Sequence, residues 1–427
     1  MAGQSFRFLH ASHFCLASPL SGIVDVPDDL RDLLVHAPRE ACERVFEVAL
    51  REEVDFVVLS GDILEPAGAG PAIVAFLLQK LESLRAQNIA VYWAGSKMDM
   101  DDDLLFSLEL PGNVHLFPSD RVERVPFCRG EIPVVSLSGR SWNSQRPLRG
   151  AEFARDGQEE FQLAVLYGAG DLDTNLPGGI DYWALGGSHE VANPRTTQYR
   201  VAHGPGSPQG MCPWDAGAHG CTLVSVDGEG EIRMRRMETD TVRWQNESLE
   251  FAEGTANRDI RQTMRSRLEN RNAAPDRPRL ITWTLTGPGR FDSPLAARGM
   301  REELLDWSRK EFGHRTPPVW SLAVDIEPPE EITGAWCDDD SILGDYLRIV
   351  HDRMDAETEP IDLRGMLPQR QLPDALREAL SVLDADETKA ALRGAAVQGA
   401  DLLRGDDSAA RPSSPYSSPA EPEGVPT

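Results

Sequence analysis

Long apolar runs are missing from this sequence. No segment reaches the roughly 20 consecutive apolar residues that a membrane-spanning helix requires. The first residues, Met1 to Leu9, lack the basic stretch followed by an apolar run that marks a secretory signal. We therefore expect a cytoplasmic protein that has no membrane partner.

Cysteine is scarce and scattered. None of the six cysteines forms a C-x-x-C pair; they stand at Cys15, Cys42, Cys128, Cys212, Cys221 and Cys337. This spacing argues against a zinc ribbon and against a disulfide framework, and it fits a reducing compartment.

Positive charge is also in short supply. The 43 lysines and arginines are outnumbered by 69 aspartates and glutamates, which gives a formal net charge of −26. Such a charge repels a phosphate backbone at long range. If the protein acts on nucleic acid, a bound metal, a local basic patch or a partner must supply positive charge.

The composition is that of a globular protein, with 41% hydrophobic and 26% charged residues. A chain of 427 residues predicts two or three domains. The first part alternates apolar strand patterns with amphipathic helix patterns, which indicates an α/β layered domain. Strands are predicted at 6–11, 54–62, 89–93, 114–117, 132–137, 162–166, 182–185, 199–202 and 222–226, and helices at 39–53 and 73–87.

A second unit begins near Arg243 and Trp244. It reads as a small α+β module, because helix patterns at 257–270 and 296–310 alternate with strand patterns at 280–285 and 319–326. Helices are predicted at 343–354 and 373–403, and from Gly405 onward Ser, Pro, Ala and Glu predict a disordered tail. The predicted domains are 1–242, 243–335, 336–404 and 405–427.

Polar side chains follow several predicted strands at the same edge of the sheet. Asp62 ends the Val54–Asp62 stretch, and carboxyl ends of strands are where α/β sheets build sites. His13 and Cys15 stand two residues apart on an extended segment and so point the same way. Two plainer interpretations stay open: Asp62 caps a turn, and Cys15 is a small core residue.

Five segments of the chain together resemble the calcineurin-like metallophosphoesterases, in the branch of bacterial SbcD-type DNA-repair exonucleases. They are Phe6–Ala17, Val54–Asp62, Val91–Asp99, Leu163–Gly168 and Asp181–His189. Residues 205–209 and 217–224 are similar to a later loop and strand of that branch, and the unit after Trp244 is similar to its DNA-capping domain. The resemblance implies a layered α/β sandwich, with two sheets flanked by helices, a small α+β capping domain and a helical C-terminal region.

The family holds two metal ions, usually manganese, with the pattern D-x-H, G-D, G-N-H-D, a lone His and G-H-x-H. At these ligand positions Asp62 and His189 keep the expected residue type. The other positions carry His13 and Cys15 for the first Asp and His, Ser96 for Asn, Lys97 for the catalytic His, Tyr167 for the lone His and Gly187 for the next His.

One carboxylate and one imidazole cannot hold two hard divalent ions. We therefore expect no metal cofactor, and we expect Lys97 to pair with Asp62 in place of the missing ions. In the alternative, His13, Cys15, Asp62 and His189 hold one zinc ion, since all three residue types are acceptable zinc ligands. An active enzyme of this family would use manganese or zinc.

The resemblance also implies partners. Family nucleases work with an SMC-like coiled-coil ATPase that docks on helices after the capping domain, which correspond to residues 343–403 here. We expect a non-catalytic, pseudo-nuclease subunit of an SbcCD-type complex that scaffolds or regulates this ATPase and reaches DNA through it; a homodimer is implied by resemblance. The alternatives are an active metal-dependent DNA exonuclease or phosphodiesterase, and an interaction domain unrelated to DNA.

Overall fold

The structure is a computed structural model. It describes residues 4–23, 25–64, 68–100, 108–153, 160–168, 179–191, 196–197, 200–252, 255–270, 276–286, 294–326, 341–355 and 385–404. These residues fall into two compact units. The first comprises Met1–Glu247, Met264–Trp283 and Leu305–Ala323, and the second comprises Ser248–Thr263, Thr284–Leu304 and Val324–Thr427.

The first unit contains a six-stranded sheet with the strand order β12-β11-β1-β2-β3-β4. Its strands are β1 (Phe6–Ala11), β2 (Phe56–Leu59), β3 (Ala90–Trp93), β4 (Val114–Leu116), β11 (Gly220–Val226) and β12 (Ile232–Glu238). Strands β1 to β4 are parallel, whereas β11 pairs antiparallel with β1 and β12. The parallel strands therefore deliver their following loops to one edge of the sheet.

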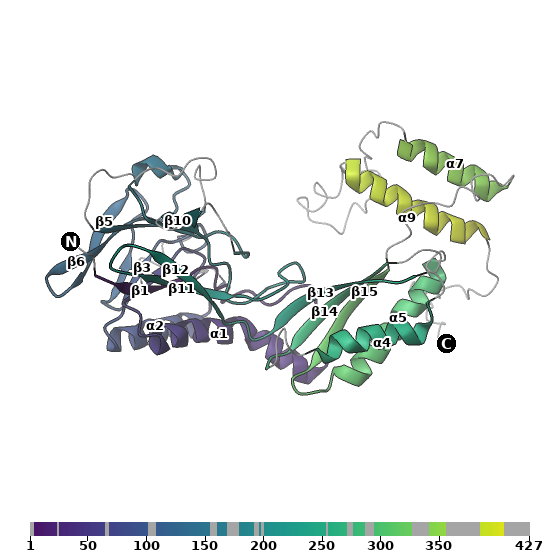
Figure 1. Ribbon diagram of the computed structural model, residues 1–427, viewed down its shortest axis with the longest axis horizontal. Helices are drawn as coiled ribbons and strands as arrows, with labels where there is room; N and C mark the ends of the chain where they lie inside the picture. The colour runs from purple at the N-terminus through teal and green to yellow at the C-terminus, as the bar shows by residue number, and fades with distance from the viewer. Residues whose placement is uncertain are drawn as a thin grey trace, which may run out of the picture. The chain divides into compact units, whose positions relative to one another are not determined.

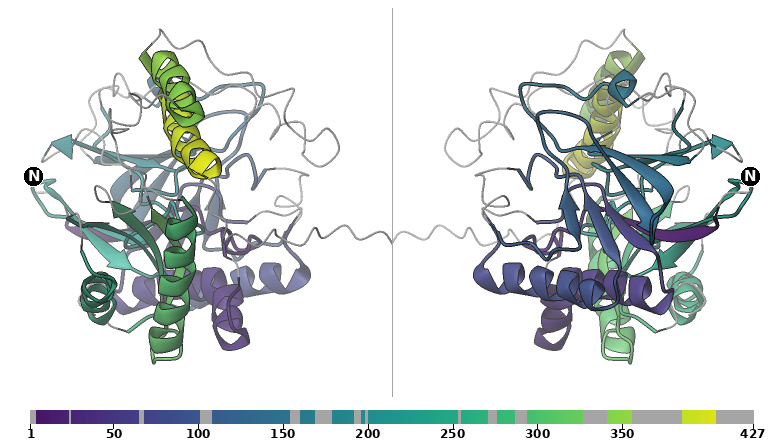
Figure 2. Two further views of the ribbon diagram at one scale, coloured as in Figure 1. Left: turned by 90° about the vertical axis from the view of Figure 1, so that its right-hand side faces the viewer. Right: turned by 90° about the vertical axis from the view of Figure 1, so that its left-hand side faces the viewer.

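Two helices, α1 (Asp28–Arg51) and α2 (Pro71–Ala86), cover one face of this sheet (Figures 1 and 2). Successive residues of β1 point to opposite faces, so Leu9 packs with the helices while Phe8 faces the other way. Acidic Asp28 and Asp29 stand in the first turn of α1 and Arg51 in its last, as the helix dipole favours.

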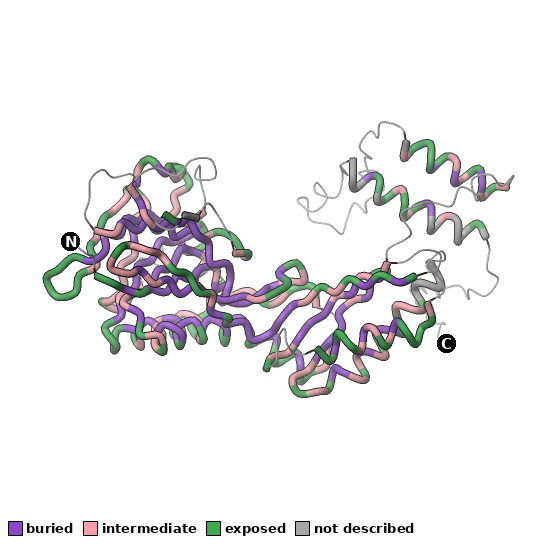
Figure 3. Tube along the Cα trace, viewed as in Figure 1, coloured by how far each residue is buried: buried purple, intermediate pink, exposed green. Residues whose placement is uncertain are grey.

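A second six-stranded sheet packs on the other face and has the order β5-β6-β7-β8-β10-β9. Its strands are β5 (Glu123–Arg129), β6 (Ile132–Arg140), β7 (Phe161–Leu166), β8 (Tyr182–Leu185), β9 (Thr196–Thr197) and β10 (Arg200–His203). Aromatic and aliphatic side chains fill the space between the sheets, and buried residues follow the strands of both (Figure 3). The fold is a layered α/β sandwich, as the sequence predicted.

Buried His10 joins the two sheets near the site edge. Its Nδ1 lies 3.0 Å from the Tyr182 hydroxyl, and its Nε2 lies 2.9 Å from the hydroxyl of Ser60. The Ser60 hydroxyl in turn donates to the Leu185 carbonyl at 3.0 Å. These polar contacts fix the end of β2 against the end of β8.

The second predicted module contains a three-stranded sheet with the order β13-β14-β15. Its elements are β13 (Arg243–Glu250), α4 (Asn257–Glu269), β14 (Arg279–Thr286), α5 (Pro294–Phe312) and β15 (Val319–Ile326). Within the first compact unit, Trp244, Leu280, Trp320 and Leu322 form one apolar cluster with Leu30 and Leu34 of α1.

The second compact unit includes a helical pair, α7 (Ile342–Asp355) and α9 (Ala385–Arg404). The two helices run side by side (Figures 1 and 2) and share an apolar cluster around Leu347, Val350 and Ala396. The Tyr346 hydroxyl donates to the Ala395 carbonyl at 2.6 Å. No helix among the described ranges is both long and apolar enough to cross a membrane.

Most predicted elements are found within a few residues of their expected bounds, but α1 is a clear exception. The helical spacing of apolar residues predicts this helix only from Arg39 onward. The structure carries the helix through buried Pro38 and starts it at Asp28. Strands β5, β9, β12 and β13 were not predicted. The predicted boundary near 335, the helix residues 373–384 and the tail from 405 lie outside the described residues, and the boundary at 242 stays a prediction.

A Gly186→Ala substitution tests how closely the two sheets approach at the site. A Cβ at Gly186 would lie 1.6 Å from the backbone oxygen of Ser60, so the strand ends must separate to admit it. We expect the free energy of unfolding to fall by about 1–3 kcal/mol, measured by urea denaturation. Gly112→Ala is the matched control, since nothing lies within 4 Å of its Cβ and its φ is outside the left-handed region. Equal stability of the two variants would contradict this close approach.

Candidate metal and phosphoester site

The site lies where loops follow the carboxyl ends of β1, β2, β3, β7 and β8. Backbone hydrogen bonds fasten these loops together: His13 N donates to Gly61 O at 2.9 Å, and Phe14 N donates to Asp62 O at 2.7 Å. Gly168 N donates to Gly186 O at 3.1 Å. The structure describes all eight predicted site residues, and they come from loops that are tied to one another.

Three site residues have left-handed backbone conformations, which is unusual for non-glycine residues. The φ angles are 57° at His13, 51° at Cys15 and 55° at Asp62. Such conformations cost energy and concentrate at functional sites. The departures from the family pattern at 13 and 15 are thus held in a defined geometry.

His13 lies between two partners. Its Nδ1 is 2.6 Å from Asp62 Oδ2, and its Nε2 is 2.8 Å from the Nε2 of His189. On the far side of His189, Nδ1 lies 3.7 Å from Oδ2 of the buried Asp215. The four side chains form a row, Asp62, His13, His189 and Asp215, in which each imidazole turns Nδ1 toward a carboxylate.

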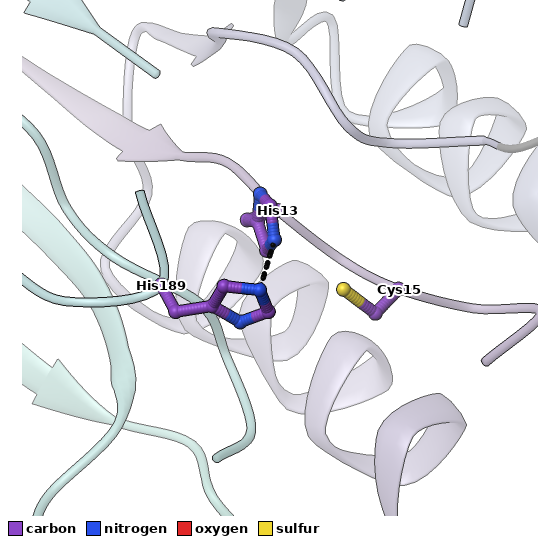
Figure 4. Close-up of side chains that lie close together, drawn as sticks. All are labelled: His13, Cys15 and His189. Atoms are coloured by element: carbon purple, nitrogen blue, oxygen red, sulfur yellow. Dashed lines mark hydrogen bonds between the residues drawn. The ribbon is translucent and has the colours of Figure 1, made fainter. Parts of the chain in front are cut away.

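Cys15 completes a cluster with the two histidines. One ligand atom each of His13, Cys15 and His189 lies within 4.8 Å of the others. Figure 4 shows both rings and the sulfur directed toward a common region, with the hydrogen bond between the rings drawn as a dashed line. Asp62 stands outside this cluster, against Nδ1 of His13.

The row of side chains shifts the acidities within it. Burial lowers the pKa of His13, but the contacts with Asp62 and Cys15 outweigh burial and raise it to about 10. Burial raises the pKa of Asp62, yet His13 prevails and the net shift is downward. The pKa of His189 is lowered by burial and then by the charge of His13. The pair His13 and Asp62 is therefore charged at neutral pH.

Lys97 does not take the position expected of it. Its side chain is exposed, and no ion pair of Lys97 is found within the described ranges, whereas Asp62 pairs with His13. The expectation that Lys97 neutralises Asp62 was wrong. A buried carboxylate needs a nearby cation. The imidazole of His13 supplies one at a lower cost in side-chain entropy than a flexible, exposed lysine would.

The remaining predicted positions surround Asp62 without supplying new ligands. Ser96 is buried, and its hydroxyl accepts a hydrogen bond from Asp99 N at 3.1 Å. The half-buried Tyr167 has a pKa raised to about 12, by burial first and by Asp62 next, so it stays protonated. Gly187 brings the β8 loop against that of β7, since its Cβ would lie 3.3 Å from Gly168.

Asp99 is a structural residue that the sequence prediction missed. Its buried carboxylate accepts hydrogen bonds from Ile63 N at 2.9 Å, Leu64 N at 2.7 Å and Ser96 N at 2.9 Å. Burial outweighs these bonds and raises its pKa to about 6. Asp99 therefore ties the loop after β2 to the loop after β3. Its place as the last residue of the third signature segment, Val91–Asp99, was the available signal.

Asp215 and His219 were also missed as site residues: Asp215 stands in no motif, and His219 stands in the stretch 217–224, for which no site role was predicted. Asp215 is positioned by Met211 N, which donates to its Oδ2 at 2.7 Å. His219 lies 3.0 Å from the Asp215 backbone oxygen through Nε2 and 2.9 Å from the Ser207 hydroxyl through Nδ1. Only the fold brings this loop behind His189.

The donors of this site fit one ion better than two. The Nδ1 atoms of both histidines already face carboxylates, at 2.6 Å from Asp62 and 3.7 Å from Asp215, which leaves the two Nε2 atoms and the Cys15 sulfur for an ion. Two hard ions would each need several oxygen or nitrogen donors, and the side chains at 96, 97, 167 and 187 do not provide them. Two nitrogens and one sulfur are instead a typical donor set for a single zinc-like ion.

Comparison with known proteins points to the same superfamily. No family model matches this chain. It is 25% identical over 341 residues to YhaO of Bacillus subtilis (strain 168), which is named an uncharacterized metallophosphoesterase. The match covers 76% of this chain and 82% of that protein. The similarity supports the metallophosphoesterase superfamily, whose members generally use divalent metals.

The raised pKa of His13 predicts how stability depends on pH. Between its ordinary value of 6.5 and about 10, His13 holds a proton when folded and loses it when unfolded, so stability falls as pH rises. One such proton corresponds to about 1 kcal/mol per pH unit. We expect His13→Gln to remove this slope between pH 7 and 8.5 in urea denaturation, and exposed His36→Gln to keep it. Parallel slopes in wild type and His13→Gln would refute the assignment.

Proposed function

We propose that this protein is a phosphoesterase-fold subunit of a DNA-repair complex of the SbcCD type, which scaffolds or regulates an SMC-like ATPase and does not cut DNA by two-metal chemistry. The observation that carries this proposal is the donor set at the strand ends. A two-metal reaction needs a pair of ions that clamp the attacking and leaving oxygens. The side chains present would hold one ion at most.

The residue type at position 97 also supports the loss of the nuclease reaction. In the family that the sequence resembles, this position is occupied by the histidine that stabilises or protonates the leaving group. Lys97 is exposed and does not provide an imidazole, the group that most often transfers protons in catalysis. Ser96 does not supply the side-chain amide that the resemblance expects at this position, and its hydroxyl accepts a hydrogen bond from Asp99 N.

The helical pair of the second compact unit supports a protein-binding role. Ile342 and Ile349 of α7 are 75% and 66% exposed, and a spacing of seven residues puts them on one side of the helix. Leu403 of α9 is also exposed. Helices of this kind are what an apolar coiled-coil partner can pack against. In the nucleases that the sequence resembles, the corresponding helices dock the ATPase.

The charge of the protein favours contact with DNA through the complex. A formal net charge of −26 opposes unaided binding to a phosphate backbone. In this proposal the partner supplies the positive surface. A homodimer, as in the nucleases that the sequence resembles, is compatible with the same role.

A second candidate function is an active metal-dependent DNA exonuclease or phosphodiesterase with a rebuilt site. It is favoured by the cluster of His13, Cys15 and His189, which lies at the edge of the sheet where this family performs its chemistry. A single bound ion can polarise a phosphoryl oxygen and lower the pKa of a water molecule. The two candidates differ in one readout, hydrolysis.

A nuclease assay separates these candidates. With manganese, magnesium or zinc added in turn, we expect the full-length protein to leave linear duplex DNA and a chromogenic phosphodiester intact, because the leaving-group residue and most ligands are absent. Asp62→Ala is assayed beside it. Hydrolysis that the substitution abolishes would overturn the non-catalytic proposal, while hydrolysis that persists in Asp62→Ala comes from a contaminant.

The ATPase partner is tested on the exposed face of α7. We expect the tagged full-length protein to retain a large coiled-coil ATPase from its source cells, identified by mass spectrometry. The double variant Ile342→Asp, Ile349→Asp should lower recovery at least about tenfold, since buried apolar anchors dominate such interfaces. His351→Asp, an exposed change about 180° around the helix from Ile342, should bind as wild type. No ATPase on the wild type, or equal recovery with the double variant, would contradict the proposed docking.

A further inference from the structure

We propose that His13, Cys15 and His189 bind a single zinc ion, with Asp62 and Asp215 as outer carboxylates that orient the two imidazoles. This inference goes beyond the proposed function, because it requires no catalysis. It differs from the two-ion manganese centre of the resembling family in the number of ions, in the donor atoms and in the role of Asp62.

The first support is convergence of suitable atoms. Two imidazole nitrogens and one sulfur lie within 4.8 Å of one another, and the two Nε2 atoms are 2.8 Å apart. Tetrahedral zinc with Zn–N distances of about 2.0–2.1 Å needs its nitrogens roughly 3.3 Å apart. A small rotation of either ring therefore opens the site for an ion.

The second support is the arrangement behind each ring. Metal-bound histidines almost always present their second nitrogen to a carboxylate, a carbonyl or water. Here Nδ1 of His13 lies 2.6 Å from Asp62 and Nδ1 of His189 lies 3.7 Å from Asp215. Both rings thus turn Nε2 toward the shared position, and two separate loops supply the carboxylates.

The third support is that the ring contact seen here is one that a metal replaces. A hydrogen bond between two Nε2 atoms needs one shared proton, and a metal ion coordinated by both nitrogens takes the place of that proton. His189 is 43% exposed along its side chain, so the position is open to solvent on that side. A metal ion can therefore take the place of this proton, and it can enter from the solvent-exposed side of His189.

The donor chemistry selects the ion. A thiolate together with two imidazoles suits zinc and disfavours manganese, which prefers oxygen donors. Three protein ligands leave a fourth position for water or another small ligand, as zinc sites that are not closed by four side chains do. Buried Cys42 and Cys221 lie in the apolar core with the helices and have no part in this site.

Cobalt titration of the metal-free full-length protein tests the site without relying on activity. Cobalt bound by a thiolate gives a sulfur-to-metal charge-transfer band, which zinc should abolish on displacing cobalt at a ratio of one ion per chain. Cys15→Ser should remove the band, whereas Cys128→Ser, at an exposed position on β5, should keep it. Cys212→Ser should also keep it, which separates Cys15 from the thiol nearest to Asp215 in the sequence.

Two more variants distinguish ligands from outer partners. His189→Gln, at a side chain that is 43% exposed, should lower zinc affinity at least about tenfold because it removes one of the three ligands. Asp62→Asn should lower it about 10–100-fold but retain the charge-transfer band, since the thiolate ligand remains. The inference is overturned if the wild type gives no band, if Cys15→Ser keeps the band, or if two manganese ions bind more tightly than zinc.

Discussion

The close approach of the ends of β2 and β8 is the constraint on which this site depends. Ser60 and Gly186 meet without room for a single extra carbon, and the Ser60 hydroxyl bridges His10 of the first sheet and Leu185 of the second. This contact holds Asp62 and His189, from different sheets, on either side of His13. A substitution that separates the two sheets at this edge would move the site residues apart even if every one of them were kept.

The same constraint creates a problem of charge that His13 resolves. Asp62 is almost wholly buried, and a buried carboxylate without a cation is costly. In metallophosphoesterases of the kind that the sequence resembles, metal ions supply that cation. Here the imidazolium of His13 does so from a left-handed backbone conformation. His13 then has one nitrogen left, and that nitrogen faces His189 beside Cys15.

Sequence patterns were sufficient for the layers and for the grouping of the loops. Apolar periodicity placed β1, β2, β3 and the helices, and the expectation that parallel strands end at one edge brought His13, Asp62 and His189 together. The sequence patterns did not predict which side chain neutralises Asp62, because that pairing depends on the left-handed conformations of His13 and Asp62. Asp215 was equally out of reach, because it stands in no motif and reaches His189 only through the fold.

The most direct test of this account is a crystal structure grown with both manganese and zinc, with anomalous difference maps recorded at the absorption edge of each metal. The account predicts one zinc peak among His13, Cys15 and His189, Asp62 beyond the coordination sphere, and no manganese. Two manganese ions bridged by Asp62 would contradict it, and would restore the two-metal enzyme that the ligand positions argue against.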